Sequence, residues 1–263
     1  MNVEYTQVSD LGQVREQNED YLGYAIPANP KQARTQGWLF ALADGVGGHA
    51  QGEVASRTAV EAMLAGFRES DGSESLGSLL KRLVQAANTR VLEAAIAAGP
   101  SGAGMATTLV ACALRFDRAV VAHVGDSRCY LVRRGRAISL TRDHTMANEQ
   151  ARLGLISSAE AAESRHILSR CLGAELAVNV DVSEHVVLAG DALVLCSDGL
   201  HGAVSNSEIG SVVRESRDLS GAAHKLVSLA NQRDGSDNIS AQLIRIISVE
   251  RVGTYRGLPY KLR

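Results

Sequence analysis

The sequence predicts an α+β protein in which helices cover antiparallel β-sheets. Apolar segments of strand length follow one another through connections too short for a crossover helix, so neighbouring strands must pair antiparallel. Helical periodicity is confined to separate blocks of the chain. With 263 residues, 45% of them hydrophobic, the chain is long enough for one large core. Since only 4% are aromatic, Ala, Val, Leu and Ile must build most of that core.

Nine segments are rich in β-branched residues or alternate between apolar and polar residues, as strands do. Short turns join most of these segments, which is typical of antiparallel sheets. In chain order the predicted strands are Val3 to Val8, Tyr21 to Ile26, Trp38 to Ala43, Thr107 to Phe116, Ala119 to Val124, Cys129 to Val132, Val178 to Leu188, Ala192 to Cys196 and Ile239 to Val249.

Two amphipathic helices are predicted in the first half of the chain. Apolar residues recur at helical spacing from Ala55 to Phe67 and from Leu76 to Ile96. A capping box, which pairs an N-cap serine with a glutamate three residues later, marks the beginning of a helix. Two such boxes and a last periodic stretch predict further helices, at Ser157 with Glu160, at Ser205 with Glu208, and from about Ser220 to Asn231.

Charge and hydropathy exclude several classes of function. The 27 Lys and Arg residues are balanced by 29 Asp and Glu residues, which disfavours binding to nucleic acid. The longest apolar runs are far shorter than the roughly 20 residues of a membrane span. The first ten residues lack the pattern of a secretory signal. We therefore expect a cytoplasmic protein that binds neither nucleic acid nor membranes, and we expect a monomer.

The four cysteines do not form a recognisable metal or disulfide pattern. Their separations offer no paired ligands for zinc and no compact disulfide framework. Two of them lie inside apolar runs, which favours buried, reduced thiols. The four are Cys112, Cys129, Cys171 and Cys196, and the two in apolar runs are Cys112 and Cys196.

Acidic residues recur at the ends of the predicted strands. A single Asp-Gly pair is most simply a turn, but strands of one sandwich can bring several such ends to the same edge. Carboxylates gathered there repel one another unless cations neutralise them. The acidic positions are Glu19 and Asp20 before the second strand, Asp44 after the third, Asp126 after the fifth, Asp198 after the eighth and Asp237 before the ninth.

Such a cluster of carboxylates favours hard divalent cations. Oxygen ligands without a nearby set of cysteines or histidines indicate Mg²⁺ or Mn²⁺ rather than zinc. Two such ions about 3.5–4 Å apart can lower the pKa of a water between them and direct it at phosphorus.

Seven ordered motifs resemble those of the metal-dependent serine/threonine protein phosphatases, type 2C, in their bacterial form. The resemblance extends from about Val3 to Val249. Each motif alone is unspecific, whereas seven in the same order are very specific. The motifs are REQNED (15–20), DGVGGH (44–49), GMATT (104–108), GDSR (125–128), DH (143–144), SDG (197–199) and DN (237–238).

The resemblance implies a sandwich of two antiparallel β-sheets flanked by helices, in α-β-β-α layers. It also implies hydrolysis of phosphoserine and phosphothreonine in proteins by attack of a water that bridges two Mn²⁺ or Mg²⁺ ions. Phosphorylated proteins, the products of serine/threonine kinases, would be the partners. The phosphatase domain would span residues 1–249, with a flap at about 146–173 that contacts the substrate and a C-terminal tail at 250–263.

Roles for single residues follow from the same resemblance. Asp44 would bridge the two metals, and the Gly45 carbonyl would bind one of them. Asp198 and Asp237 would hold the other metal.

Further positions complete this implied site. Glu19 and Asp20 fall where the family orients metal-bound water. Asp126 would bind a third, weaker ion that it shares with Asp198. Arg15 matches the arginine that holds the substrate phosphate, and its planar fork of donors suits phosphate oxygens.

The general acid is less determined by the sequence. Eukaryotic relatives carry a histidine directly after the Asp-Gly pair, whereas here Val46 follows and His49 comes three residues later. His49 is the first choice for protonating the leaving group, and His144 and His166 are alternatives with a suitable ordinary pKa. A hydrogen-bonded structural role is open for all three.

Three other functions would use residues of the same kinds. Ser78 with Lys81, together with Ser236-Asp237-Asn238, echoes penicillin-recognising serine enzymes, but no lysine is followed by Thr-Gly or Ser-Gly. A two-metal nuclease could use similar carboxylates, and the acidic balance of the chain disfavours it. A catalytically weak module of the same fold that binds phosphoproteins is the remaining alternative.

Overall fold

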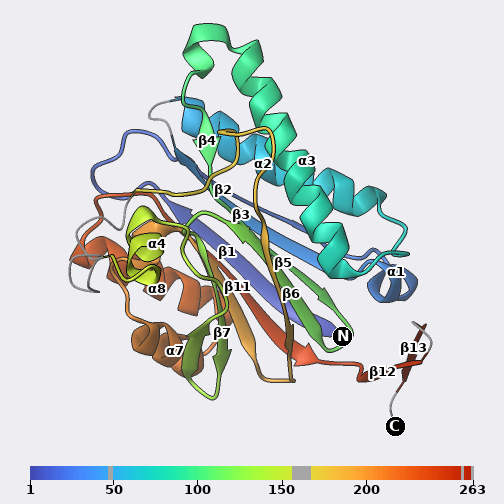
Figure 1. Ribbon diagram of the computed structural model, residues 1–263. Helices are drawn as coiled ribbons and strands as arrows, with labels where there is room; N and C mark the ends of the chain where they lie inside the picture. Colours follow the sequence, from blue (N-terminus) through green and yellow to red (C-terminus); the bar gives the residue numbers. More distant parts are fainter. Residues whose placement is uncertain (47–49, 156–166, 256–257, 262–263) are drawn as a thin grey trace.

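The protein is a sandwich of two antiparallel sheets with helices on both outer faces (Figure 1). The computed structural model describes residues 1–46, 50–155, 167–255 and 258–261. The first sheet has the order β2-β3-β5-β6-β9, with the short β4 paired to β3, and the second has the order β1-β11-β10-β7-β8. All pairings within the two sheets are antiparallel, as the short connections predicted.

The bounds of the strands place the acidic motifs at one end of the sandwich. In the first sheet the strands are β2 (Asp20–Ala25), β3 (Trp38–Val46), β4 (Ala106–Thr107), β5 (Leu109–Arg115), β6 (Arg118–Val124) and β9 (Asp181–Val186). In the second they are β1 (Asn2–Asp10), β7 (Arg128–Arg133), β8 (Arg136–Ser139), β10 (Ala192–Cys196) and β11 (Ile239–Ser248).

Helices α2 and α3 cover the first sheet, and α7 and α8 cover the second (Figure 1). The helices are α1 (Pro30–Thr35), α2 (Ala50–Glu69), α3 (Leu76–Ala97), α4 (Met146–Arg152), α6 (Asp198–His201), α7 (Asn206–Glu215) and α8 (Leu219–Arg233), and a 3₁₀ turn spans Gly99–Gly102.

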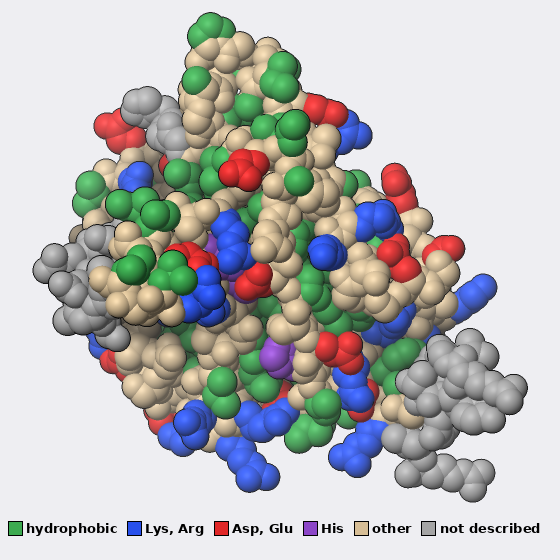
Figure 2. Space-filling model, viewed as in Figure 1, with side chains coloured by type: hydrophobic (Ala, Val, Ile, Leu, Met, Phe, Trp, Pro, Cys, Tyr) green, Lys and Arg blue, Asp and Glu red, His purple; other side chains and the backbone are tan. Residues whose placement is uncertain are grey.

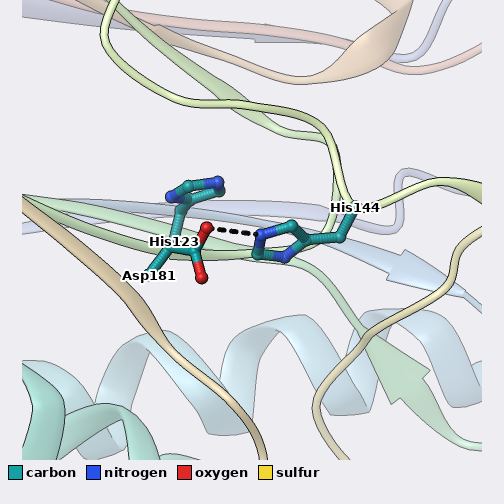
Figure 3. Close-up of side chains that lie close together, drawn as sticks. All are labelled: His123, His144 and Asp181. Atoms are coloured by element: carbon teal, nitrogen blue, oxygen red, sulfur yellow. Dashed lines mark ion pairs between the residues drawn. The ribbon is translucent and has the colours of Figure 1, made fainter. Parts of the chain in front are cut away.

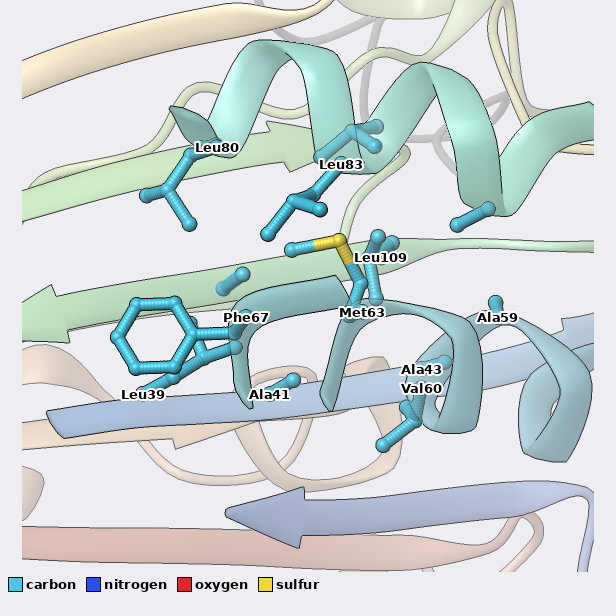
Figure 4. Packing of buried hydrophobic residues seen from close by; sticks show 14 of the residues in the cluster. Leu39, Ala41, Ala43, Ala59, Val60, Met63, Phe67, Leu80, Leu83 and Leu109 are labelled. Carbon is cyan, nitrogen blue, oxygen red and sulfur yellow. The ribbon is translucent and has the colours of Figure 1, made fainter. Parts of the chain in front are cut away.

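Three apolar clusters hold the four layers together. Met63 and Phe67 of α2 pack with Leu39 of β3 between the helices and the first sheet (Figure 4). The next residue on β3, Phe40, faces the opposite way and packs against the second sheet, because side chains alternate along a strand. A third cluster joins α7 and α8 to the outer face of the second sheet and includes Ile209 of α7. The α-β-β-α layering is therefore confirmed.

The predicted elements differ from the structure mainly at interruptions and at short helices. The expected strand from Thr107 to Phe116 is divided into β4 and β5, both paired with β3. The ladder is interrupted at Thr108, where the Asp44 N–H donates to the side-chain Oγ1 of Thr108 rather than to a backbone carbonyl. Helix α1 was missed because none of its residues is buried, so it has no apolar stripe.

The predicted capping box of Ser205 and Glu208 is confirmed at the start of α7. That of Ser157 and Glu160 lies outside the described residues. Cys112 and Cys196 are buried free thiols, as expected.

The C-terminal strands lie apart from the acidic motifs (Figure 1), and the surface carries charges of both signs. Strands β12 (Val252–Tyr255) and β13 (Leu258–Lys261) pair with each other in a two-stranded sheet within the predicted tail. Acidic and basic side chains are interspersed over the face shown in Figure 2. Among the described residues, no helix is both long and apolar enough to cross a bilayer.

Candidate metal centre and active site

The register between β2 and β3 brings two acidic motifs together. Asp20 pairs directly with Asp44 across the two strands. The backbone N–H of Gly45 donates to the carbonyl of Glu19 at 3.0 Å. Residues more than 20 positions apart in the sequence therefore lie side by side at the end of the first sheet.

The interruption between β4 and β5 fixes the backbone of Asp44. Its N–H donates to Thr108 Oγ1 at 3.0 Å, and its carbonyl accepts from the Thr108 N–H at 2.9 Å and from Thr107 Oγ1 at 2.8 Å. Thr108 Oγ1 also lies 2.7 Å from the hydroxyl of Ser127, the neighbour of Asp126. Both backbone polar groups of Asp44 are therefore satisfied, and its carboxylate is held on a fixed backbone.

Asn238 clamps the segment that carries Glu19. Its Oδ1 accepts the Glu19 N–H at 2.8 Å, and its Nδ2 lies 3.0 Å from the carbonyls of both Leu11 and Gln17. The Asn238 N–H donates to Asp237 Oδ1 at 2.8 Å. The Asp-Asn motif thus ties the start of β11 to the loop before β2, a role that spacing alone did not reveal.

Asp20 is buried behind these groups, with 7% of its surface exposed. Its Oδ2 accepts a hydrogen bond from Ser197 Oγ at 2.7 Å, and Ser197 in turn accepts the N–H of Ser240. Its Oδ1 is buried and has no hydrogen-bond partner among the described residues. Burial raises the pKa of Asp20 to about 7, against the effect of hydrogen bonds from Ser240 and Ser197.

A cavity of about 670 Å³ opens over this end of the sandwich. Seven of the predicted site residues line it, and Asp20 lies behind its wall. The remaining lining comes from Val46, Thr108 and the segment before β9. The predicted residues that line it are Arg15, Glu19, Asp44, Gly45, Asp126, Asp198 and Asp237, and the other lining residues are Val46, Thr108, Ile167, Leu168 and Cys171.

A smaller cavity of about 280 Å³ shares Asp126, Asp198 and Asp237 with the first. It is also lined by His201 and by Asp143, which binds Arg128 through two hydrogen bonds of 2.8 and 2.6 Å. The three shared aspartates therefore form a wall with open space on both sides.

The carboxylates of the site raise one another's pKa. Burial is the largest cause of the raised pKa of Asp44, followed by the nearby charges of Asp20, Asp198 and Asp126. Burial and the charge of Asp198 raise the pKa of Asp126 to about 7. Without a counter-charge this arrangement is electrostatically unfavourable, since like charges in a partly dry site repel strongly.

Divalent cations fit these residues. The donor set consists of carboxylate and backbone oxygens, which Mg²⁺ and Mn²⁺ prefer. The backbone is packed closely here, because a Cβ at Gly45 would lie 2.2 Å from the Gly52 carbonyl oxygen and one at Gly52 would lie 2.7 Å from the Glu19 carboxylate. Asp20 Oδ1, which has no hydrogen-bond partner in the part of the chain that the structure describes, leaves a further oxygen for an ion or its water.

Arg15 lies at the rim of the larger cavity. Its Nη2 donates to Asp237 Oδ2 at 2.8 Å, and its side chain is 44% exposed. Burial by itself would lower the Arg15 pKa, but the hydrogen bond and charge of Asp237 outweigh it and the pKa is raised. A permanently charged guanidinium at this place can bind an anion that enters the cavity.

Of the three predicted histidines, only His144 is among the described residues; His49 and His166 lie outside them. The His144 side chain is 3% exposed, and both its ring nitrogens have partners outside the larger cavity. Burial lowers its pKa to about 4.

The sequence did not point to His201, which follows the SDG motif. Its Nε2 lies 3.0 Å from the carbonyl of Asp126, and burial lowers its pKa to about 4. It could have been suspected only from its position one helical turn after Asp198.

Comparisons with known proteins agree with this arrangement. The family description "Protein phosphatase 2C" matches residues 14–243. A serine/threonine phosphatase, stp, of Listeria monocytogenes is 34% identical over 254 residues, 95% of this chain and 96% of the relative. Protein phosphatase PhpP of Streptococcus pneumoniae is 30% identical over 246 residues, 92% of this chain and 97% of the relative.

Solved structures are similar over nearly the whole chain. The S. agalactiae serine/threonine phosphatase superposes with a TM-score of 0.85 at 32% identity, covering 93% of this chain and 100% of that one. The catalytic domain of the protein phosphatase PstP, in complex with two manganese ions, gives 0.78 at 33% identity and covers 94% and 99%. The chain therefore belongs to the protein phosphatase 2C family, in its bacterial form.

Proposed function

We propose that this protein hydrolyses phosphoserine and phosphothreonine in proteins with the help of bound divalent cations. The observation that carries the proposal is a single cavity lined both by Asp44, which is buried and paired in register with Asp20, and by the exposed Arg15. Excess negative charge at the floor suits metal ions, and a guanidinium at the rim suits a phosphate. Relatives named serine/threonine phosphatases support the same activity.

The cofactor would be two Mn²⁺ or Mg²⁺ ions, with a third in a weaker site. Manganese in the PstP structure supports this. When bound, the ions would supply an activated water and neutralise charge on the phosphate. Asp44 and the Gly45 carbonyl would hold one ion, and Asp44 would hold the other together with Asp198 and Asp237. Asp126 would hold the third ion with Asp198. Glu19 and Asp20 would orient the water bound to these ions.

The remaining steps belong to side chains of this chain. Arg15 would bind the phosphate oxygens through two parallel N–H donors and so orient the phosphoryl group over Asp44. Thr108 keeps the backbone of Asp44 in place while the substrate binds. His49 would protonate the leaving serine or threonine oxygen.

The organisation of the chain is part of the proposal. Residues 1–249 would form the phosphatase domain and residues 250–263 a separate tail. The flap would comprise residues about 146–173 and touch the protein substrate, which is supported by Ile167, Leu168 and Cys171 in the lining of the cavity.

Phosphorylated proteins in a kinase-dependent signalling pathway of the cytoplasm would be the partners. The near balance of 27 basic and 29 acidic residues supports a protein that binds neither nucleic acid nor membranes. We further propose that it acts as a monomer.

Hydrolysis of a phosphothreonine peptide tests the activity. The protein would first be stripped with EDTA and then titrated with Mn²⁺, with release of inorganic phosphate as the readout. We expect no turnover in EDTA and full turnover after Mn²⁺ is added. Tight binding of the peptide without turnover would instead indicate a phosphoprotein-binding module, and full activity without metal would contradict the proposed mechanism.

A further inference from the structure

A polar cluster centred on His144 lies beside the larger cavity and has no part in the proposed chemistry. His144 is stacked on His123 with ring centroids 4.6 Å apart, and its Nε2 lies 3.2 Å from Asp181 Oδ2 (Figure 3). Arg170 and Glu149 complete the cluster. A buried polar cluster of this kind fixes the segments that contribute to it, since each member needs its partners.

One side of the His144 ring holds the turn before Asp126. The backbone N–H of His144 donates to the Gly125 carbonyl at 2.9 Å, and the Gly125 N–H donates to the ring Nδ1 of His144 at 3.2 Å. Gly125 has a φ of +101°, and a Cβ there would lie 2.6 Å from Thr108 Cβ, so the turn is pressed against the residue that fixes Asp44. Asp126 enters the cavity from this turn.

The other side of the ring holds the segment before β9. Because Nδ1 accepts a hydrogen bond, the ring proton is on Nε2 and is donated to Asp181 Oδ2. Asp181 Oδ1 accepts from Arg170 Nη1 at 3.1 Å, and Arg170 Nη2 donates to Glu149 Oε1 of α4 at 3.1 Å. The His144 carbonyl also accepts the Ser169 N–H at 2.9 Å.

These contacts reach the wall of the cavity. Ile167, Leu168 and Cys171, which line it, flank Ser169 and Arg170 in the sequence. The N–H of Met146 donates to the Ile167 carbonyl at 2.8 Å, which joins the start of α4 to the same segment. The His144 side chain thus contacts both the turn that presents Asp126 and Arg170 of the segment that contributes to the cavity lining.

A bound metal is the competing explanation of this cluster. His123, His144 and Asp181 each offer a ligand atom, and these atoms lie within 4.8 Å of one another. Arg170 already supplies the positive charge, because its Nη1 lies 3.1 Å from Asp181 Oδ1 and 3.3 Å from His144 Nε2. An ion would have to displace the guanidinium, so the contacts fit better a structural role in which His144 connects two segments by hydrogen bonds.

We propose that His144 is a positioning residue that couples the Asp126 turn, through Nδ1, to residues 167–171, through Nε2 and Asp181. The inference rests on the proposed metal site in one respect, namely that an ion at Asp126 is what the coupling transmits. Binding of the ion would tighten the turn, and the ring would pass this restraint to the cavity wall that contacts the substrate.

Two substitutions separate the two sides of the ring. In His144→Asn the amide Oδ1 takes the place of Nδ1 as an acceptor for Gly125, while the contact with Asp181 is lost. In His144→Gln the amide Nε2 takes the place of the ring Nε2 as a donor to Asp181, while the acceptor for Gly125 is lost. His185→Gln on β9 is the matched control, since its ring contacts Ser183.

Calorimetric Mn²⁺ binding and amide hydrogen exchange of residues 167–173 are the two readouts. For the wild type and His185→Gln we expect Mn²⁺ to slow exchange in this segment. His144→Gln should weaken the weakest Mn²⁺ site by about tenfold, the effect typical of groups that orient metal ligands. His144→Asn should bind Mn²⁺ within about threefold of the wild type and lose the effect of Mn²⁺ on exchange.

Two outcomes would overturn the proposal. One is that both variants match the wild type in Mn²⁺ affinity and in exchange. The other is that both lose the two properties equally, which would reduce His144 to a general stabiliser of the fold. Neither readout requires turnover. A wild type that binds Mn²⁺ and shows the coupling but hydrolyses no phosphopeptide would therefore contradict the proposed function and still support the role proposed for His144.

Discussion

The two ends of the sandwich treat buried aspartates in opposite ways. At one end Asp191, with a side chain only 4% exposed, binds Arg133 through hydrogen bonds of 2.9 and 2.6 Å and accepts the Leu188 N–H. At the other end Asp44 lies among further carboxylates, and burial and their charges raise its pKa. At the first end an arginine of the protein neutralises the buried carboxylate. At the second end the groups that raise the pKa of Asp44, beyond burial itself, are other carboxylates.

This difference shows how a functional site departs from structural rules. A buried charge is tolerated when a partner of opposite sign accompanies it. Carboxylates that instead accompany one another destabilise the fold unless a ligand supplies the missing charge. The acidic end therefore indicates a place where the protein gives up stability in order to bind cations.

The largest expected difference between the two ends is in activity. Asp44→Asn removes a charge that both ions would share and should lower kcat by about 100-fold or more. Asp191→Asn is the matched change at the other end and should leave kcat within about twofold, because its carboxylate binds Arg133 and the Leu188 N–H and Asp191 is not among the described residues that line either cavity beside Asp126. Phosphate release from a phosphothreonine peptide at saturating Mn²⁺ measures both. A nearly normal kcat in Asp44→Asn would refute the assignment.

The second expected effect concerns the only guanidinium that lines the larger cavity among the described residues, that of Arg15. Arg15→Ala should weaken binding of the phosphorylated substrate and of inorganic phosphate by about 1.5–3 kcal/mol, the range for a hydrogen bond to a charged group. Arg15→Lys should recover only part, since an ammonium cannot present two parallel donors. KM and phosphate inhibition are the measurements, with metal content as the control. Unchanged values would make Arg15 a surface residue paired with Asp237.

The third expected effect is a loss of stability, which should occur only when the aspartate at the arginine-paired end is replaced. Asp191→Asn should lower the free energy of unfolding by about 1–3 kcal/mol, because Arg133 and the Leu188 N–H lose a charged acceptor. Denaturant unfolding of the EDTA-treated protein gives the value. The same measurement on Asp44→Asn should show a gain, since one of the repelling charges is removed. A loss of equal size in both variants would contradict the contrast between the ends.

The smallest expected effect is a pH dependence of the metal-free protein. The pKa values of Asp20 and Asp126 are raised to about 7, so the folded state binds protons that the unfolded chain, with a pKa of about 3.9, has released. Stability should therefore fall between pH 6.5 and 8, by about 1 kcal/mol for each group. His144 and His201, with pKa values lowered to about 4, act in the opposite direction but only below about pH 6.5.

Melting temperatures at the two pH values test this. We expect Tm to fall by about 5 °C on going to pH 8 in EDTA. Asp126→Asn should show roughly half of that decrease. Saturating Mn²⁺ should remove it, because the carboxylates are then held in their charged form. A Tm that rises between pH 6.5 and pH 8 would show that ionisation of these carboxylates does not destabilise the folded protein.

Periodicity and turn signals predicted most of the fold. The strand expected from Trp38 begins where β3 begins, and the capping box of Ser205 marks the start of α7. Helix α1 escaped because it buries no residue, although Asn29 and Pro30 carry the N-cap and N1 signals of a helix start. The spacing of apolar residues predicts a helix or strand only where one face of that element is buried.

The site was predictable as a set of acidic residues at strand ends but not as a structure. Thr108, Ser197 and Asn238 act through hydrogen bonds to residues 60 to more than 200 positions away, and no local pattern encodes such pairs. His144 shows the same limit. As a histidine with a suitable ordinary pKa it was a candidate general acid. In the structure, however, its Nδ1 accepts from the Gly125 N–H and its Nε2 lies against Asp181.

Binding of Mn²⁺ to the metal-free protein tests the central claim most directly, because it asks whether the acidic end is completed by cations. Calorimetric titration of the wild type, Asp44→Asn and Asp191→Asn would give the number of ions and their affinities. The structure predicts at least two ions for the wild type and for Asp191→Asn, and loss of at least one of them in Asp44→Asn. Equal Mn²⁺ binding by all three proteins, or none by the wild type, would contradict it.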